Sequence, residues 1–462
     1  MFFDYDLLCN LVRGDYSRHD RIFRTLDKVG NLYRVPECCG RRYDRGGRLL
    51  RDSEYHYSYD CEGNLVRKSG REHLTPGIPD VGKHRTNPWV RKERTGRDIN
   101  GSSIPRTGGM DFVEWEPGDT CYEWQSNGML AGVRMADGRT VTFGYDALGR
   151  RVSKRIGDTV RRFGWDGNVL LHEWEIPVAE LPRLVVSEDG SETYDRPETY
   201  RGLVTWVYDG ESFTPVAKVT EKERYTIVHD YLGTPTQAYD SEGNLVWEML
   251  LDVYGRVMES RGDRSLVPFR YQGQYEDMET GLYYNRFRYY SPEMGMYISS
   301  DPIGLAGNNP TLYGYVQDVN TWLDILGLIV LPDFTYNSDG TIHTATATIT
   351  SSDLGTGTNT NASSRRYARS LGSPTDDAGH IIGKQLGGSG GKANVFPQNP
   401  NVNRGSFAQF EGRVASLVHE SESVNITITF EYDSGTRPTS VRYEAVGNHG
   451  RKLTQTFKNT CN

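Results

Sequence analysis

Tyr239-Asp240-Ser241-Glu242-Gly243-Asn244-Leu245 is one copy of a short unit that recurs along the first half of the chain. The unit places an aromatic residue and an aspartate before a glycine, and an apolar residue follows. A glycine can adopt positive φ at this point, and the pattern is typical of two strands joined by a tight turn. The repeat predicts stacked β-hairpins that bury their faces against their neighbours. Further copies begin at Tyr43, Tyr59 and Tyr145, and degenerate copies begin at Leu26 and Trp165.

The composition agrees with a β-rich and turn-rich chain. There are 51 glycines and 29 tyrosines in 462 residues, a length that favours two or three domains. No run of 18 apolar residues exists and the first residues do not resemble a signal peptide, so we expect no membrane segment and export only through a dedicated system. The six cysteines include no C-x-x-C pair, which indicates neither a disulfide framework nor a zinc site and favours synthesis in a reduced cytosol.

The net charge of −8 is unevenly distributed. From Ile329 onward there are 12 Lys and Arg and 11 Asp and Glu, which gives +1, and the preceding residues therefore carry −9. An acidic body followed by a near-neutral C-terminal part indicates separate tasks. Binding to a polyanion would then depend on local arginines and a metal ion, because no global basic field exists.

The chemistry of the chain lies near its C-terminus. Asp376-Asp377-Ala378-Gly379-His380 is followed by Asn394, Asn403 and Glu411 in that order. A neutral histidine can take a proton from water near pH 7. A hard divalent cation can stabilise charge that develops on a phosphate, and Mg²⁺ needs few protein oxygens because it retains water. The ordered set therefore favours a metal-assisted phosphodiesterase.

The residues around this set predict a strand, an irregular metal segment, a helix and further strands. Residues 341–350 alternate with period two, and residues 424–432 and 440–446 form a predicted hairpin. We expect Gly379 to permit a tight turn before the histidine, and the glycine run 387–391 to be a flexible loop. The helix is predicted from apolar spacing at Phe407, Phe410, Val414, Leu417 and Val418.

The repeated unit resembles the YD repeat of Rhs (rearrangement hotspot) proteins. The segment from Gly281-Leu282-Tyr283-Tyr284-Asn285 to Asp301-Pro302-Ile303-Gly304-Leu305 is similar to the Rhs core-associated segment. The resemblance implies a β-shell that encloses a variable C-terminal toxin. We therefore expect a mostly β Rhs/YD-repeat shell segment followed by a small α+β domain of the ββα-metal type. The expected divisions are a YD-repeat shell segment at 1–265, a core-associated segment at 266–328 and a toxin domain at 329–462.

The same resemblance implies a self-cleavage site. Asp324-Ile325-Leu326-Gly327-Leu328 corresponds to a second Asp-Pro-x-Gly-Leu copy, with Ile325 in place of the usual proline. By resemblance, Asp301 and Asp324 form an aspartyl-protease-like dyad that cuts Leu328-Ile329, and two such carboxylates would share one proton. Taken from the residues alone, both aspartates also fit turn caps.

The C-terminal set resembles the DNA/RNA non-specific endonucleases of the ββα-metal (His-Me finger) type. That resemblance implies that His380 is the general base and Asn403 the direct Mg²⁺ ligand. Glu411 would hold water molecules of the metal, Asn394 would be a supporting polar contact, and Asp377 would orient the loop. Taken singly, a histidine fits a structural role, an asparagine a helix cap and a glutamate a solvated helix residue.

One position departs from the signature of that family. Ala378 stands where arginine is usual, a pattern that favours a branch found in bacterial toxins. A phosphate-clamping arginine is still expected. The candidates are Arg365, Arg366, Arg369 and Arg404.

The combined pattern predicts an Rhs-family antibacterial toxin, made in the producer's cytoplasm and delivered by a type VI secretion system. Its C-terminal endonuclease would cleave DNA in the cytoplasm of a competing cell, with Mg²⁺ or alternatively Mn²⁺ as cofactor. A cognate immunity protein is implied as a partner in the producing cell. The alternatives are an RNase toxin, an inactive structural YD-repeat protein, and a chain that is mainly a self-processing protease.

Overall fold

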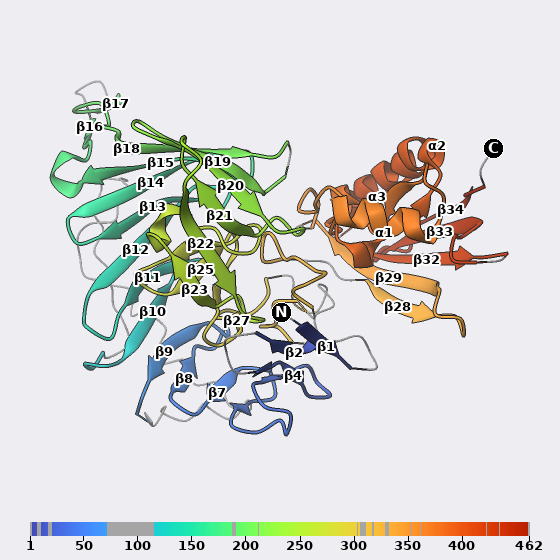
Figure 1. Cartoon of the computed structure of the whole chain (residues 1–462), viewed down its shortest axis with the longest axis horizontal. Coiled ribbons are helices and arrows are strands. Elements are labelled where there is room, and N and C mark those ends of the chain that lie inside the picture. Colours follow the sequence, from blue (N-terminus) through green and yellow to red (C-terminus); the bar gives the residue numbers. More distant parts are fainter. Residues whose placement is uncertain are drawn as a thin grey trace.

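The computed structural model places a large β-rich part beside a smaller C-terminal part that contains both helices and strands (Figure 1). The structure describes residues 2–6, 11–16, 21–71, 115–186, 191–210, 212–302, 304, 311–316, 318–328, 332–351, 353–360, 362–421, 423–433 and 435–460. Ile329, on the far side of the predicted cleavage point, lies outside these residues. None of the described helices is long and apolar enough to cross a membrane.

A sixteen-stranded antiparallel sheet of described strands forms the wall of the large part. Its strands follow one another in chain order because short turns join neighbouring antiparallel strands. The strands are β6 (Arg42–Tyr43), β7 (Leu49–Arg51), β8 (His56–Tyr59), β9 (Leu65–Ser69), β10 (Thr120–Trp124), β11 (Leu130–Arg134), β12 (Thr140–Tyr145), β13 (Arg151–Ile156), β14 (Thr159–Asp166), β15 (Val169–Pro177), β18 (Arg201–Tyr208), β19 (Pro215–Thr220), β20 (Arg224–His229), β21 (Pro235–Tyr239), β22 (Leu245–Leu251) and β23 (Val257–Arg261).

Smaller elements complete this part. They are β1 (Phe2–Tyr5), β2 (Leu11–Asp15) and β3 (Ile22–Phe23) in one sheet, β4 (Thr25–Leu26) with β5 (Leu32–Tyr33), β16 (Leu184–Val186) with β17 (Glu192–Tyr194), and the 3₁₀ turns η1 (Val178–Glu180) and η2 (Arg264–Leu266).

In most copies of the repeated unit, the aspartate closes the turn with its own side chain. Asp240 Oδ1 accepts hydrogen bonds from the backbone N–H groups of Glu242 (3.0 Å) and Asn244 (2.8 Å), and Oδ2 accepts one from the Asn244 side chain (3.0 Å). Gly243 has φ +83°, in the left-handed region that glycine occupies without steric cost. The same bonds recur at Asp60. The hairpin prediction is confirmed, and its basis is local turn chemistry.

Tyrosines at the ends of strands link neighbouring hairpins. Tyr145 donates its hydroxyl hydrogen bond to the Leu130 carbonyl, and Tyr208 donates to the Leu170 carbonyl, each at 2.8 Å. Large apolar side chains pack inside the wall, where Trp206 is fully buried. The hydroxyls find partners while their rings remain in the core, which is how buried tyrosines are accommodated.

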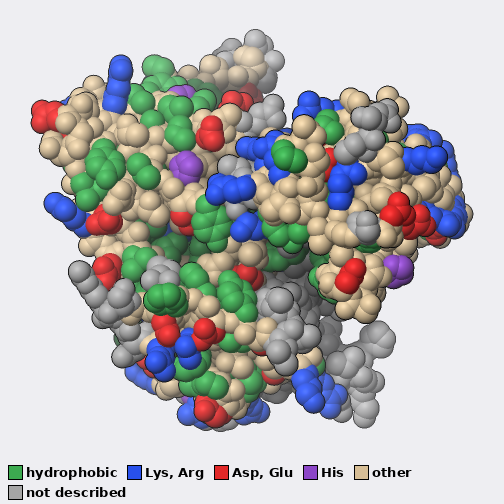
Figure 2. All heavy atoms as spheres, turned by 45° about the vertical axis from the view of Figure 1, so that its right-hand side comes forward, with side chains coloured by type: hydrophobic (Ala, Val, Ile, Leu, Met, Phe, Trp, Pro, Cys, Tyr) green, Lys and Arg blue, Asp and Glu red, His purple; other side chains and the backbone are tan. Residues whose placement is uncertain are grey.

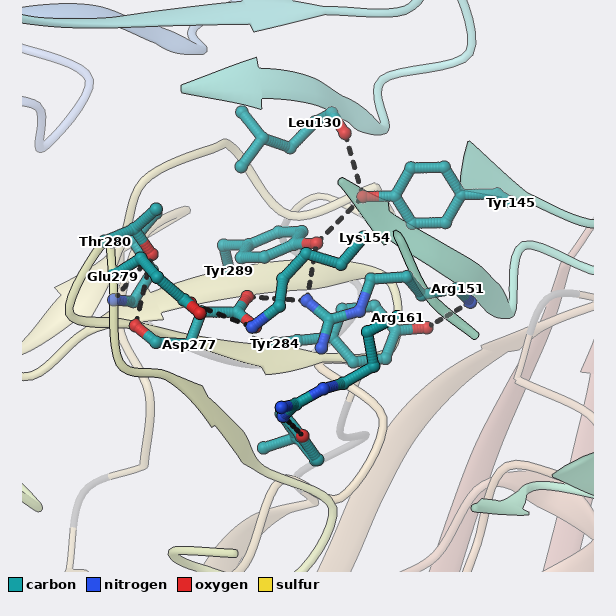
Figure 3. A network of polar contacts seen from close by, with 12 residues as sticks. Leu130, Tyr145, Arg151, Lys154, Arg161, Asp277, Glu279, Thr280, Tyr284 and Tyr289 are labelled. Carbon is teal, nitrogen blue, oxygen red and sulfur yellow. Dashed lines mark hydrogen bonds and ion pairs between the residues drawn. The ribbon is translucent and has the colours of Figure 1, made fainter. Parts of the chain in front are cut away.

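A four-stranded segment lies inside the curved wall. It consists of β24 (Tyr275–Asp277), β25 (Leu282–Asn285), β26 (Arg288–Ser291) and β27 (Met296–Tyr297), all composed of buried residues. Asp277 is fully buried and accepts from Arg151 (2.5 Å) and Lys154 (3.0 Å) of β13 (Figure 3). Buried charges persist only when they are paired, so this network fixes the segment to the wall.

The C-terminal part has its own hydrophobic core. Its sheet has the order β28 (Asp333–Tyr336), β29 (Ile342–Thr350), β32 (Ser423–Glu431), β33 (Ser440–Gly447), β34 (Lys452–Lys458), and α3 (Ala408–Glu420) packs on β32 and β33. The remaining elements are α1 (Ala362–Leu371), the hairpin of β30 (Asp377–His380) and β31 (Val395–Gln398), η4 (Lys384–Leu386), η5 (Lys392–Asn394), α2 (Pro400–Val402) and the π-helical turn η6 (Asn403–Phe407).

The predicted fold class, a mostly β shell followed by a small α+β domain, is confirmed. Two local predictions are wrong. The metal segment expected to be irregular contains the β30–β31 hairpin. The glycine run 387–391 is not a loose loop, because Gly388 to Gly391 are buried and bonded to Thr358 through the Gly388 carbonyl (3.1 Å) and the Gly390 N–H (2.8 Å). The domain divisions at 265 and 328 stay predictions.

Candidate active site

The β30–β31 hairpin carries the histidine and sets its surroundings. In the register, Asp377 pairs with Gln398 and Gly379 with Phe396. A Cβ at Gly379 would lie 2.0 Å from Gln398 Oε1, so the fully buried glutamine side chain crosses the space that a larger residue would fill. The predicted tight turn at Gly379 is therefore wrong, because this glycine lies within a strand and makes room for a neighbour.

His380 is oriented through one ring nitrogen. Its Nε2 lies 2.9 Å from the Thr358 carbonyl, which can only accept, so Nε2 carries the hydrogen and Nδ1 keeps its lone pair. Burial lowers the pKa of His380, the bond to Thr358 opposes this shift, and the positive charge of Lys384 lowers the pKa further. The imidazole is therefore neutral near pH 7, in the form that can take a proton at Nδ1.

Asp377, on the same strand as His380, binds a second predicted site residue, Asn403. Its Oδ2 accepts from the Asn403 amide nitrogen at 3.0 Å, and Arg404 donates to both carboxylate oxygens at 2.8 and 2.7 Å. Burial would raise the pKa of Asp377, but the bonds from Arg404 and Asn403 outweigh it and the pKa lies below its ordinary value. With its nitrogen held, Asn403 presents only Oδ1 as a further ligand atom.

Glu411 lies in the first turn of α3 and is only 9% exposed. Its Oε1 has no hydrogen-bond partner among the described residues, and burial raises the pKa of the carboxyl to about 8. The carboxyl group packs against Gly383, where a Cβ would lie 2.2 Å from Oε1. A buried acid without a partner is costly, so an additional cation or donor fits this position.

The donor set fits a hard divalent cation. An amide oxygen from Asn403 and carboxylate oxygens from Glu411 are ligands of the kind that Mg²⁺ accepts, with water completing the shell. The described residues contain no group of three or more His, Cys, Asp and Glu that could hold a metal. A site here would therefore rely on an asparagine and on retained water, as the sequence predicted.

Asn394 and Asp376 support the site through hydrogen bonds to the surrounding chain. Asn394 is fully buried, accepts from the Ile382 N–H (3.0 Å) and donates to the carbonyls of Ile382 (2.9 Å) and Ser389 (2.8 Å). All of its polar atoms are therefore used to fix the loop after the histidine. Asp376 is held by both guanidinium nitrogens of Arg437, at 2.7 and 2.8 Å.

Sequence reasoning missed three supporting residues. Thr358 orients the histidine, Gly383 makes room for Glu411, and Arg437 neutralises Asp376. The only signal in the sequence was the pair Asp376-Asp377, because two adjacent carboxylates usually bind different partners. Thr358 and Arg437 had no signal in the local pattern.

The second predicted pair also meets in space. Asp301 and Asp324, both buried, contact the same Nη2 of Arg288 at 2.9 and 3.1 Å. Asp324 also accepts from the Tyr297 hydroxyl (2.7 Å) and the Leu328 N–H (2.8 Å). The predicted cleavage residue is therefore bonded directly to one member of the pair.

Arg288 places a positive charge beside the two carboxylates that were expected to share one proton. Burial raises the pKa of Asp324, while the Arg288 cation and the Tyr297 and Leu328 hydrogen bonds oppose that rise. Arg288 also donates to the Gly327 carbonyl at 2.5 Å, next to Leu328. The bond from the Leu328 N–H is of the type that closes turns elsewhere in the chain, so the turn-cap interpretation describes part of the same geometry.

Fold and site together define a β-shell protein with a C-terminal domain of nuclease type, and comparisons with known proteins agree. Residues 333–447 match the DNA/RNA non-specific endonuclease family, and residues 191–311 match the Teneurin YD-shell family. The expectation of a YD-repeat shell and an endonuclease domain in one chain is confirmed.

The relatives include "Probable deoxyribonuclease RhsA" of Dickeya dadantii, 33% identical over 92% of this chain and 26% of that protein. "Toxin protein Tse5" of Pseudomonas aeruginosa is 37% identical over 62% of this chain and 25% of that protein. The chain thus spans about a quarter of the length of these relatives. A crystal structure of TcdB2-TccC3-TEV aligns with 71% of this chain and 17% of that chain, at 18% identity and a TM-score of 0.38.

Proposed function

We propose that this chain is an Rhs-type toxin whose C-terminal domain hydrolyses phosphodiester bonds in DNA. The observation that carries the proposal is that one strand, β30, carries the histidine and the aspartate that binds Asn403. His380 is held in the tautomer of a base, and Asn403 is tied to Asp377 on the same strand. The family match over residues 333–447 and the name of the Dickeya relative, a probable deoxyribonuclease, support DNA as substrate.

Each residue of the site has a separate role in the proposed hydrolysis. His380 Nδ1 takes a proton from the attacking water, and the Thr358 carbonyl stabilises the imidazolium that results. Asp377 holds Asn403 and Arg404 in place, which keeps the amide oxygen of Asn403 in a fixed position. Glu411 places a carboxyl group at a buried position, and Asn394 fixes the loop between the histidine and the hairpin's second strand.

A divalent cation, Mg²⁺ or alternatively Mn²⁺, would supply charge neutralisation at the phosphate. Asn403 Oδ1 would hold it directly and Glu411 would hold its water molecules. The unpartnered Oε1 of Glu411 supports this assignment.

The test uses the purified full chain with supercoiled plasmid and total RNA in parallel, with Mg²⁺, Mn²⁺ or EDTA. We expect plasmid cleavage that EDTA abolishes, and RNA as the first substrate lost if the RNase alternative holds. Asn403→Ala should raise the Mg²⁺ concentration needed, whereas Asn425→Ala, an exposed asparagine of the same domain, should not. Plasmid that stays intact with both ions, or is cut equally in EDTA, contradicts the proposal.

We also propose that the chain cuts itself between Leu328 and Ile329. The meeting of Asp301 and Asp324 at Arg288, with Leu328 bonded to Asp324, supports it. Mass spectrometry of the purified chain should show a fragment ending at Leu328 that Asp324→Asn eliminates.

Asp240→Asn is the matched control for self-cleavage, because it removes a turn-capping carboxylate elsewhere in the shell. We expect this variant to be cut like the parent chain. An uncut parent chain, or cleavage that persists in Asp324→Asn, rejects the self-cleavage proposal.

The wider role proposed for the protein is antibacterial. The Pseudomonas relative is named a toxin protein, which supports a toxin role. By resemblance we propose delivery by a type VI secretion system into the target-cell cytoplasm and a cognate immunity protein in the producer. Expression of the chain in a susceptible bacterium should arrest growth, and the His380→Ala variant should not.

A further inference from the structure

A cleft of about 750 Å³ lies between the C-terminal domain and the shell. Figure 2 shows Lys and Arg side chains gathered where the two parts face each other. The two walls of the cleft carry opposite charge. The C-terminal side contributes Arg365, Arg366 and Lys384, and the shell side contributes Asp166, Asp209 and Asp230.

The basic wall leads to the candidate base. Thr358 lines the same cleft, and its carbonyl holds His380 Nε2 at 2.9 Å. Lys384 is near enough that its charge lowers the pKa of His380. A phosphate chain that follows this wall would therefore pass Thr358, the residue that holds the imidazole, while His380 itself does not line the cleft.

The arginines of this wall are placed to bind an external anion. Arg365 and Arg366 are adjacent on α1 and exposed, because Ser364 and Ala368 form the buried side of the helix. Within the described parts of the chain, neither arginine makes an ion pair. Arg365 donates to the Thr360 carbonyl, which holds it at the cleft.

The other two candidate arginines are engaged elsewhere. Arg369 donates to the Asp376 carbonyl at 3.2 Å, and Arg404 is bound to Asp377 through both carboxylate oxygens. Their guanidinium groups support the hairpin and the asparagine. Among the four arginines that the sequence left open, these contacts favour Arg365 and Arg366.

We infer that Arg365, Arg366 and Lys384 form the phosphate-binding wall for the nucleic-acid strand, an inference that rests on the proposed nuclease function. In the intact chain, the carboxylates of the shell face this wall and oppose a polyanion. The volume of the cleft is that of a small-molecule pocket, so we expect it to hold a short segment of one nucleic-acid strand at a time.

The test measures binding without cleavage. A fluorescein-labelled single-stranded DNA is titrated by anisotropy in EDTA with the full chain carrying His380→Ala, over a series of salt concentrations. Arg366→Ala should weaken binding and lower the slope of log K against log salt by about 0.7, the value for one lost phosphate contact on a single strand. Arg442→Ala removes an exposed arginine outside the cleft and should leave the slope unchanged.

The shell wall is tested in the same assay. Asp209→Asn should strengthen binding by the full chain, and Asp158→Asn, an exposed turn aspartate outside the cleft, should not. Equal salt slopes for Arg366→Ala and Arg442→Ala would reject the phosphate-binding role of the basic wall. Unchanged binding in Asp209→Asn would reject the proposal that the shell carboxylates oppose binding.

The outcome separates this inference from the proposed function. A slope lowered only by Arg366→Ala supports the wall even if the parent chain leaves plasmid uncut in Mg²⁺. Plasmid cleavage together with equal slopes leaves the nuclease proposal standing and overturns the wall. Circular dichroism of each variant confirms that the fold is intact.

Discussion

Replacing Gly383 with alanine tests whether the position of Glu411 depends on one missing side chain. Gly383 has φ −60° and ψ 149°, which alanine adopts without strain. The new Cβ would lie 2.2 Å from Glu411 Oε1, 2.5 Å from Cδ and 2.6 Å from Oε2. The perturbation therefore acts on the carboxyl group and leaves the backbone conformation allowed.

The size of the effect follows from those distances. Ordinary contact requires the carboxyl group to move by about 1 Å, because non-bonded atoms attract best near 3.5–4.0 Å. Overpacking of this kind costs about 1–3 kcal/mol, and the stiffer unfolded chain offsets about 0.4–1 kcal/mol. We expect a net loss of about 1–2 kcal/mol in the free energy of unfolding. A displacement of about 1 Å in a catalytic group should lower the cleavage rate on the order of 10²-fold.

The assay is urea unfolding followed by the helical circular dichroism signal, with plasmid cleavage measured in parallel. Gly412→Ala is the matched control, since nothing lies within 4 Å of its Cβ and an alanine inside α3 should stabilise by about 0.5–1 kcal/mol. Glu411→Ala should remove the clash, so the double variant should show a coupling of about 1–3 kcal/mol. Equal stability and activity of Gly383→Ala and Gly412→Ala would refute the reasoning.

Three further predictions concern buried polar groups. Burial raises the pKa of Glu411 from 4.5 to about 8, so its stabilising contribution is present below pH 4.5 and is lost as pH rises through 8. The free energy of unfolding, measured by urea titration in EDTA, should fall by up to about 5 kcal/mol over this range in the parent chain and should not fall in Glu411→Gln. Asn394→Ala should cost about 2–4 kcal/mol in thermal unfolding, because it leaves three buried backbone groups unpaired. Asp277→Asn should cost about 3–5 kcal/mol, measured by tryptophan fluorescence, because Arg151 and Lys154 lose their buried partner.

The parts of the fold that the sequence predicted correctly depend on local interactions. The turn bonds of Asp240 span two and four residues, so the repeated unit contains both partners. Helix α3 was found because its apolar residues repeat with the helical period and face one core. Helix α1 was missed because it is rich in serine and arginine and buries only small residues, which leaves no apolar stripe.

The parts of the site that escaped prediction depend on contacts between distant residues. Thr358 lies 22 residues before His380, and Arg437 lies 61 residues after Asp376. The motif predicted which residues carry the chemistry, but the hydrogen bond that selects the tautomer of the histidine comes from outside it. Gly379 shows the reverse case, in which the residue was identified correctly but its steric reason lies in the partner strand.

The most direct test of the central claim compares plasmid cleavage by the purified chain, His380→Ala and His343→Ala in Mg²⁺. His343 is an exposed histidine on β29 of the same domain and provides the matched control. We predict that the parent and His343→Ala nick and linearise the plasmid, and that His380→Ala is slower by about 10²–10⁴-fold, the usual contribution of a general base. Cleavage by His380→Ala at the rate of the parent chain would contradict the assignment of this site.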